Sequence, residues 1–174
     1  MLTNDPSRIL FIRPSALGDV CRSVSVLASM KQEWPSATID WLVQSEFSDA
    51  ISEHPSVDGL VLFPRQEMRR WYLPTNWLKI LRFLRFLKAK QYDLVIDGQG
   101  LGRSGLFSWA TKAKVRVGPA SAREYGWLGY TDKVKTTSKH TVDQMLDLVR
   151  ALGIEAVEDM RLYSKTEDTS WWAN

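Results

Sequence analysis

The sequence predicts an α/β fold in which one parallel sheet is flanked by helices. Short apolar runs alternate along the chain with longer segments whose apolar residues recur at helical spacing. Strands that are separated by helices pair in parallel, because each crossover returns the chain to the same end of the sheet. The 174 residues are enough for one domain with its own core. We therefore expect a single sheet whose loops gather at the carboxyl ends of the strands, where such folds bind ligands.

Each strand is predicted by an apolar run and each helix by its periodicity. The first run, ILFIR, ends at a proline, and the segment that follows its loop places Val20, Val24 and Leu27 on one helical face. Residues 98–112 are expected as a small-residue connection after the fourth strand. The expected strands are residues 9–13, 38–43, 59–63, 92–97 and 114–118, and the expected helices are residues 19–34, 46–54, 76–90 and 140–152.

The composition excludes several classes of protein. Hydrophobic residues make up 44% and charged residues 25% of the chain, which is ordinary for a globular protein. No apolar stretch approaches the roughly 20 residues that span a bilayer, and the start MLTNDPSRILF lacks the pattern of a secretory signal. The single cysteine, Cys21, cannot form an internal disulfide, which favours a reducing cytoplasm. The net charge of +3 is too small to indicate nucleic-acid binding.

The loop PSALGD after the first strand delivers a carboxylate, Asp19, to the start of a helix. Aspartate is a preferred N-cap residue, and negative charge is favoured at a helix N-terminus. The loop also lies at the carboxyl end of a strand, where an α/β fold exposes functional groups. A capping role, a chemical role, or both therefore remain open for Asp19.

The segment GLGRSG, residues 100–105, matches a glycine pattern that places the pyrophosphate of a dinucleotide on a helix N-terminus. It follows the fourth expected strand rather than the first, and the next strand, VRVG, offers no acid for a ribose hydroxyl. A tight turn and close helix packing are the simpler explanation of the glycines. Nicotinamide binding is the minor alternative.

Arginines gather on the loops at the same edge of the expected sheet. PRQEMRRW holds Arg69 and Arg70, while Arg103 and Arg123 lie on neighbouring loops. Guanidinium groups bind phosphates and carboxylates bidentately, so this cluster predicts an anionic substrate. The basic residues of the helix 76–90 are typical of a solvated face, although a basic amphipathic helix also lies against anionic lipid.

Seven segments, taken in order and at their spacing, resemble the N-terminal half of the bacterial ADP-heptose:lipopolysaccharide heptosyltransferases. They are ILFIRPSALGDV, WPSATIDWLV, HPSVDGLVLFPR, MRRW, YDLVIDGQGLGRS, SARE and HTVDQMLDLVRALG. The resemblance implies the Rossmann-like, acceptor-binding domain of a two-domain GT-B glycosyltransferase over residues 1–163. Residues 164–174 are then expected to begin a linker toward a C-terminal donor domain that this chain lacks.

The resemblance also implies roles for individual residues. Asp19 is the expected general base, which takes the proton of an acceptor hydroxyl as that oxygen attacks the anomeric carbon of ADP-heptose with inversion. Ser15 shapes the loop that precedes Asp19, and Gln99 lines the site. Arginines hold the phosphates and carboxylates of lipid A and Kdo. The expected acceptor-binding residues are Ser15, Arg69, Arg70, Gln99, Arg103 and Arg123.

The predicted activity is heptose transfer to the Kdo-lipid A or inner core of lipopolysaccharide, without a metal or other cofactor. Transfer by this chain alone is expected to be negligible, because the donor would bind the missing domain. The expected partners are an anionic acceptor and ADP-heptose, without nucleic acid. The expected location is the cytoplasm, with peripheral association at the inner membrane left open. Two alternatives remain, an NAD(P)-dependent enzyme that uses GLGRSG and a non-catalytic lipopolysaccharide- or sugar-binding module.

Overall fold

A computed structural model describes residues 4–63, 65, 69, 73–138 and 140–164 of the protein. Its centre is a six-stranded sheet of order β3-β2-β1-β4-β5-β6, in which every neighbouring pair is parallel. This confirms the predicted α/β fold, and the strand order is that of the Rossmann fold. The strands are β1 (Arg8–Ile12), β2 (Thr38–Val43), β3 (Gly59–Leu62), β4 (Leu94–Asp97), β5 (Val115–Pro119) and β6 (Asp132–Val134).

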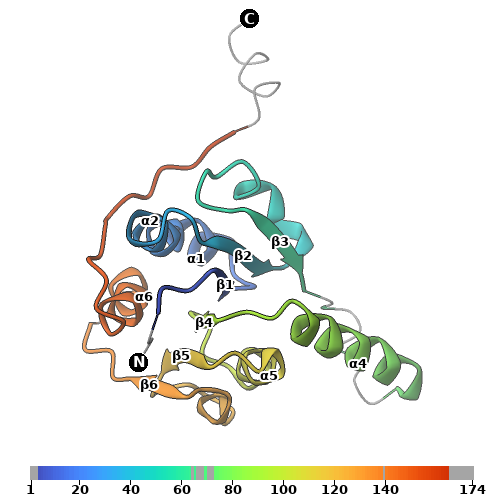
Figure 1. The fold of residues 1–174 in the computed structure, drawn as a ribbon. Coiled ribbons are helices and arrows are strands. Elements are labelled where there is room, and N and C mark those ends of the chain that lie inside the picture. The colour runs from blue at the N-terminus through green and yellow to red at the C-terminus, as the bar shows by residue number, and fades with distance from the viewer. Residues whose placement is uncertain (1–3, 64, 66–68, 70–72, 139, 165–174) are drawn as a thin grey trace, which may run out of the picture.

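Helices cover both faces of the sheet (Figure 1). The α-helices are α1 (Leu17–Arg22), α2 (Val24–Glu33), α4 (Pro74–Ala89), α5 (Gly102–Thr111) and α6 (Thr141–Arg150). Two short 3-10 helices, η1 (Ser45–Ala50) and η2 (Gly126–Gly129), complete the described elements. Helices α1, α2 and α6 lie on one face of the sheet, and α4 and α5 lie on the other.

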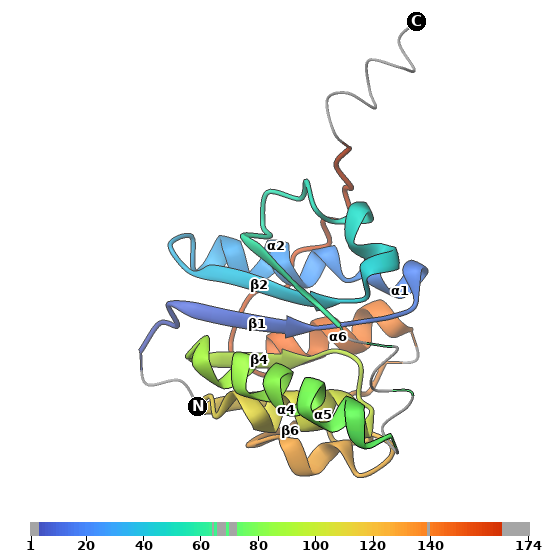
Figure 2. The same cartoon turned by 90° about the vertical axis from the view of Figure 1, so that its right-hand side faces the viewer.

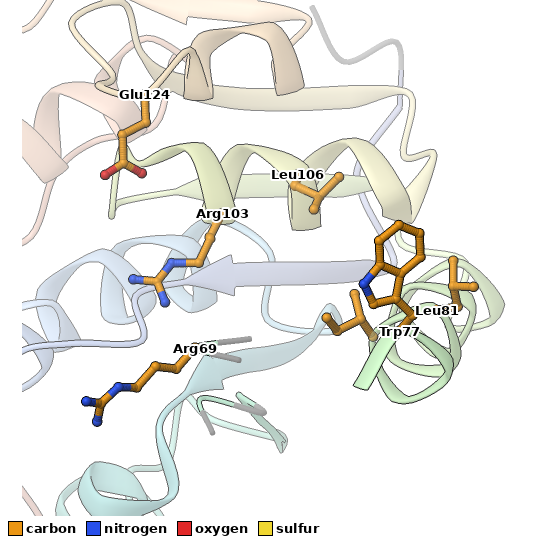
Figure 3. Close-up of a pocket in the computed structure, with 7 residues that line it drawn as sticks. Arg69, Trp77, Leu81, Arg103, Leu106 and Glu124 are labelled. Carbon is orange, nitrogen blue, oxygen red and sulfur yellow. The ribbon is translucent and has the colours of Figure 1, made fainter. Parts of the chain in front are cut away.

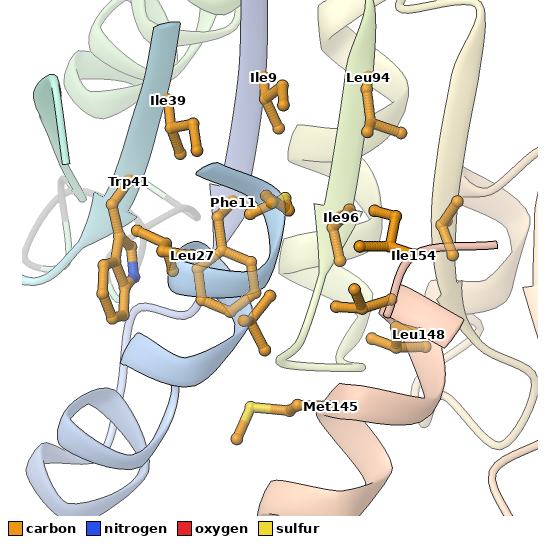
Figure 4. Packing of buried hydrophobic residues seen from close by; sticks show 14 of the residues in the cluster. Ile9, Phe11, Leu27, Ile39, Trp41, Leu94, Ile96, Met145, Leu148 and Ile154 are labelled. Atoms are coloured by element: carbon orange, nitrogen blue, oxygen red, sulfur yellow. The ribbon is translucent and has the colours of Figure 1, made fainter. Parts of the chain in front are cut away.

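Strand β1 shows why the sequence forms a sheet buried on both faces. Ile9 and Phe11 point into the cluster formed with α2 and α6, whereas Leu10 and Ile12 point into the cluster formed with α4 and α5. All four side chains are fully buried. Such a strand has no polar face, which explains the unbroken apolar run ILFI. Figure 4 shows the first of these clusters, in which Phe11 packs edge-on against Trp41 with ring centroids 5.1 Å apart.

Three expected elements differ from the structure. The segment expected as a helix over 46–54 forms the 3-10 helix η1 over Ser45–Ala50 instead. The helix expected over 19–34 is interrupted at Ser23, whose hydroxyl donates to the carbonyl of Asp19 at 2.6 Å and whose side chain also contacts Met145 of α6. Hydroxyl side chains that bond back to the helix compete with its backbone ladder. The connection expected over 98–112 contains a ten-residue helix, α5. The small residues of α5 therefore do not form a loop. They allow the helix to pack closely against η2.

An extended arm follows α6 and crosses the outside of the molecule (Figure 1). The N–H of Val157 donates to the hydroxyl of Ser29 in α2 at 2.9 Å, and Ile154 is buried in the core beneath. Farther along, the ring of Tyr163 meets the edge of His54 at a centroid distance of 5.2 Å. The arm thus ties the end of α6 to the opposite half of the sheet.

All six strands end at the same edge, so the loops that follow them gather there (Figure 2). The strand order reverses between β1 and β4, which pair through Ile12 and Asp97. The chain leaves β1 toward the face of α1 and leaves β4 toward the face of α5. A crevice opens where two such connections diverge, and open α/β sheets bind ligands there.

Candidate functional site

Asp19 lies in the first turn of α1, beside the carboxyl end of β1. Its carboxylate forms an ion pair with Arg13, at 2.6 Å between Asp19 Oδ2 and Arg13 Nη2. The N-cap residue of α1 is Ala16, and no side chain caps this helix end. The N-cap interpretation of Asp19 is therefore wrong, because the carboxylate turns toward a guanidinium instead of the backbone. About a third of the Asp19 side chain remains exposed, which leaves the carboxylate accessible from the crevice.

Arg13 borders the candidate site and was not among the residues predicted from the sequence. Its side chain is only 7% exposed and also donates through Nη1 to the carbonyl oxygen of Gly98, in the loop after β4. Its Nε is buried without a hydrogen-bond partner. One guanidinium therefore connects the loops after β1 and β4 and holds Asp19 between them. The sequence did contain a signal, because Arg13 is the last residue of the apolar run ILFIR. A charged side chain next to a buried strand is rare unless it is paired, so a partner for Arg13 was to be expected.

Asp97, the last residue of β4, holds the backbone of the loop that follows this strand. Its Oδ1 accepts hydrogen bonds from the backbone N–H groups of Gln99 and Gly100, at 2.8 and 3.1 Å, and its Oδ2 accepts from the Tyr130 hydroxyl at 2.6 Å. Burial raises the pKa of the Asp97 carboxyl, and these hydrogen bonds oppose that rise. These bonds fix the loop after β4 so that the Gln99 side chain reaches the loop after β1. There its Oε1 accepts a hydrogen bond from the N–H of Ser15 at 3.3 Å.

A pocket of about 330 Å³ opens in front of these loops. The structure brings three predicted residues together around it, Asp19, Gln99 and Arg123. Helix α6 closes the pocket on one side with Thr141 and Gln144. The pocket is mainly polar, so it suits a hydroxylated or charged ligand.

The remaining predicted residues lie in two neighbouring hollows. Ser15 and Arg103 line a small hollow of about 30 Å³ that shares Gln99 with the polar pocket. Arg69 and Arg103 line a larger groove of about 630 Å³ between α4 and α5 (Figure 3). Arg70 lies outside the described residues. Shared lining residues therefore link all three hollows along one edge of the sheet.

The dinucleotide interpretation of GLGRSG finds no support, because protein atoms occupy the space beside its glycines. A side chain at Gly105 would overlap the backbone of Gly126, and one at Gly102 would overlap the backbone of Glu124. The Glu124 carboxylate also accepts from the N–H of Gly102 at 3.2 Å, at the N-terminus of α5. An internal carboxylate thus lies where a pyrophosphate would have to bind. The glycines serve close packing of α5 on η2, as the simpler interpretation predicted.

We expect Gly105→Ala to lower the free energy of unfolding by about 1–3 kcal/mol, because the added methyl forces α5 away from the backbone of η2. Gly18→Ala in α1 is the matched control, since nothing lies within 4 Å of a methyl group there. That variant should be neutral or more stable by up to about 1 kcal/mol. Urea unfolding of both variants measures the difference. Equal stability of Gly105→Ala and the parent would contradict the packing role.

Among the described residues, no group of three or more His, Cys, Asp or Glu side chains could hold a metal ion. The predicted lack of a metal or other cofactor stays a prediction. In the same part of the chain, none of the helices combines the length and hydrophobicity needed to cross a bilayer.

A family model described as glycosyltransferase family 9 (heptosyltransferase) matches residues 80–169, just over half of the chain. The chain belongs to glycosyltransferase family 9. The resemblance read from the sequence segments is thereby confirmed, and the crevice described above is the candidate site of a family 9 protein.

Relatives of this family 9 chain agree with that assignment. The lipopolysaccharide core heptosyltransferase OpsX of Haemophilus influenzae is 26% identical over 161 residues, which cover 91% of this chain and 44% of the relative. Lipopolysaccharide heptosyltransferase 1 of Salmonella typhimurium is 33% identical over 98 residues, which cover 56% of this chain and 31% of the relative. The chain thus spans less than half the length of these curated relatives.

Solved structures extend the agreement to three dimensions. The E. coli heptosyltransferase WaaC with ADP-2-deoxy-2-fluoro heptose superposes with a TM-score of 0.76 at 28% identity, covering 87% of this chain and 50% of that one. E. coli ADP-heptose lps heptosyltransferase II superposes with a TM-score of 0.72 at 19% identity, which shows a shared fold. The parallel sheet of this family 9 chain is therefore that of known heptosyltransferases.

Proposed function

We propose that this chain forms the acceptor-binding and base-bearing part of an inverting heptosyltransferase of lipopolysaccharide synthesis. The observation that carries the proposal is the ion-paired Asp19 in a polar pocket at the strand-order reversal, with Gln99 and Arg123 around it. Membership of family 9 and similarity to named heptosyltransferases support the same reaction. The proposed acceptor is the Kdo-lipid A or inner core of lipopolysaccharide.

In the proposed reaction Asp19 accepts the proton of an acceptor hydroxyl. The freed oxygen attacks the anomeric carbon of ADP-heptose, the bond from that carbon to the phosphate oxygen breaks, and ADP leaves with the bonding electrons. Attack from the side opposite the leaving group inverts the anomeric centre. Arg13 orients the carboxylate in this step, since it holds one carboxylate oxygen and leaves the other for the hydroxyl.

We propose that ADP-heptose binds residues outside this chain. The chain covers 50% of the WaaC structure that contains a fluorinated ADP-heptose and 49% of the one that contains ADP. The expected division into residues 1–163 and a linker start over residues 164–174 stays part of this proposal. The described pockets at the crevice then belong to the acceptor.

Binding of an anionic acceptor to this chain should weaken with salt and on Arg123→Ala. A hydrogen bond to a charged group contributes about 1.5–3 kcal/mol, so the variant should bind roughly 10- to 100-fold more weakly. Raising the salt from about 0.1 to 1 M shortens the screening length from about 10 to 3 Å and should weaken the parent as well. Calorimetry with a deacylated Kdo-lipid A measures both effects.

Lys114→Ala is the matched control for this experiment. Lys114 is exposed and directly precedes β5, so it lies at the amino end of the sheet, opposite the crevice. Its removal should leave acceptor affinity unchanged. Equal affinity of Arg123→Ala and the parent would remove the polar pocket from the acceptor site.

We also propose that the protein works at the cytoplasmic face of the inner membrane and binds that surface through α4. This helix lies on the outside of the molecule (Figure 2). It carries four Lys or Arg residues and no Asp or Glu, and Leu78 and Phe86 are exposed. Exposed apolar side chains between cations suit the interface of an anionic bilayer. Scattered surface leucines are common, so the support lies in their combination with one-sided charge.

The chain should therefore sediment with vesicles that contain phosphatidylglycerol and remain in solution with vesicles of phosphatidylcholine alone. Replacing Arg82 and Arg85 by Gln should reduce the bound fraction, because each basic residue near such a surface contributes about 1 kcal/mol. Replacing Arg22 by Gln, an exposed residue of α1 on the other face of the sheet, should leave it unchanged. Equal binding to both kinds of vesicle, or full binding by the α4 variant, would contradict this surface.

A further inference from the structure

The large groove between α4 and α5 has a polar end and an apolar end. Figure 3 shows Trp77, Leu81 and Leu106 together at one end, and Arg69 and Arg103 at the other. Its volume of about 630 Å³ lies within the range of small-molecule binding sites. Nothing in the proposed chemistry at Asp19 uses this groove.

The apolar end gathers three large, exposed apolar side chains around one hollow. Trp77 is 56% exposed, Leu81 is 44% exposed and Leu106 is 37% exposed, and all three border the same hollow. Removing such side chains from water is favourable by roughly 25 cal/mol per Å² of apolar area. Apolar walls of this kind bind a hydrocarbon chain better than a sugar, which needs hydrogen-bonding groups.

The polar end favours a negative charge. Arg69 and Arg103 both border it, and Arg103 lies over the ring of Phe63 at 5.8 Å, which limits where its guanidinium can move. The Glu124 carboxylate also borders the groove but already accepts the N–H of Gly102 at 3.2 Å. Two cations next to one hydrogen-bonded carboxylate leave a net positive end, which suits a phosphate or carboxylate head group.

The groove and the polar pocket are neighbours, because the small hollow shares one lining residue with each of them. Arg103 borders both the groove and the small hollow, and Gln99 borders both the small hollow and the pocket of Asp19. A ligand that reached from the base to the apolar end would pass both of these shared residues. Such a ligand needs a polar part at Asp19, an anionic middle at Arg103 and a hydrocarbon end between α4 and α5.

We propose that the groove between α4 and α5 binds an acyl chain of the acceptor, with the adjacent anionic group of that acceptor on Arg103 and Arg69. The proposal rests on the proposed function for its placement of the acceptor sugar. The occupant is an anionic amphiphile, and its own hydrocarbon chain, rather than a bulk membrane lipid, is the part that enters the groove.

The test uses dodecyl phosphate below its micelle concentration as the probe, with inorganic phosphate as the head-group control. The chain should bind dodecyl phosphate at least about tenfold more tightly than phosphate, because several methylene groups leave water. Leu81→Asn and Leu106→Asn should each remove most of that difference. Leu162→Asn, a similarly exposed leucine on the arm after α6, should keep it. Melting curves confirm that each variant is folded.

Equal affinity for dodecyl phosphate and phosphate would overturn the proposal, as would full dodecyl phosphate binding by Leu81→Asn. Tighter binding of an uncharged dodecyl glycoside than of dodecyl phosphate would overturn the role of Arg103. A deacylated Kdo-lipid A separates this site from the proposed function. Leu81→Asn should bind it like the parent, whereas Arg123→Ala should not. Weaker binding of deacylated Kdo-lipid A by Leu81→Asn would reject the groove as a separate acyl site. Parent-like binding of it by Arg123→Ala would reject the polar pocket.

The acyl source is tested by competition. Acylated acceptor should displace dodecyl phosphate from the groove at the concentrations at which it binds the polar pocket. In Arg123→Ala, both the displacement and the binding of the acceptor should require higher concentrations. Displacement by monomeric dihexanoyl phosphatidylglycerol at lower concentrations than acylated acceptor would show that the groove prefers a bulk lipid and would overturn its assignment to the acceptor.

Discussion

Asp19→Asn should lower kcat by about two to four orders of magnitude, the usual contribution of general base catalysis, in an enzyme that joins this chain to a donor-binding part. The amide keeps the shape of the side chain but cannot accept a proton from the acceptor hydroxyl. The acceptor KM should change little, because Gln99 and Arg123 still line the pocket. Steady-state kinetics with ADP-heptose and a Kdo-lipid A acceptor measure both constants.

Asp143→Asn is a matched control for this variant. Asp143 occupies the third position of α6, as Asp19 does in α1, so both carboxylates lie in a first turn and interact alike with a helix dipole. The control should change stability little and leave kcat unchanged, whereas Asp19→Asn also loses the ion pair with Arg13 and should be less stable than the control. Retained turnover in Asp19→Asn would remove Asp19 from the role of base and would favour a non-catalytic binding module.

Arg13→Met should reduce kcat by about 10²-fold, because a carboxylate without its guanidinium partner is no longer held in one orientation. The KM for acceptor should change much less. Stability should fall by about 1–3 kcal/mol, less than for a fully buried pair, since water reaches the exposed third of Asp19. Arg13→Lys should recover part of kcat, because an ammonium keeps the charge but cannot reach both Asp19 and the Gly98 carbonyl in the same way.

Arg116→Met separates positioning from structure. Arg116 is a partly buried arginine of β5 whose Nε donates to the carbonyl of Gly129 at 2.8 Å, away from Asp19. Its replacement should lower the melting temperature without a fall in kcat. If Arg13→Met and Arg116→Met reduced stability equally and kcat not at all, Arg13 would be a structural residue only.

The fold followed from the sequence where strands are buried on both faces. The runs that form β1, β2 and β4 are apolar almost throughout, so they are visible without knowledge of their neighbours. Strand β6 was missed because it has only three residues and lies at the sheet edge, where it gains its regular conformation by pairing with β5. Helix α5 was missed because its glycines and serines lower helix propensity, and only packing on η2 explains them.

The site was predictable to the extent that its residues lie at strand ends. Asp19, Gln99 and Arg123 come from three loops after parallel strands, and the structure brings them to one pocket. The ion pair of Asp19 with Arg13 depends on how the loop between them turns, which spacing along the chain does not determine. For that reason a capping role seemed open in the sequence and is absent at α1 in the structure.

In the proposed function, the three neighbouring hollows keep the reacting groups apart from the surface that would hold the acyl chain of the acceptor. Arg13, Asp19 and the Asp97 loop depend on the paired strands β1 and β4, whereas the groove depends on outward side chains of α4 and α5. Under the proposed role of the groove, substitutions on those helices would change which acyl chain is accepted while Asp19 and Arg13 keep their geometry. The proposed acyl site would then be free to change through a few surface residues without any change in the groups around Asp19.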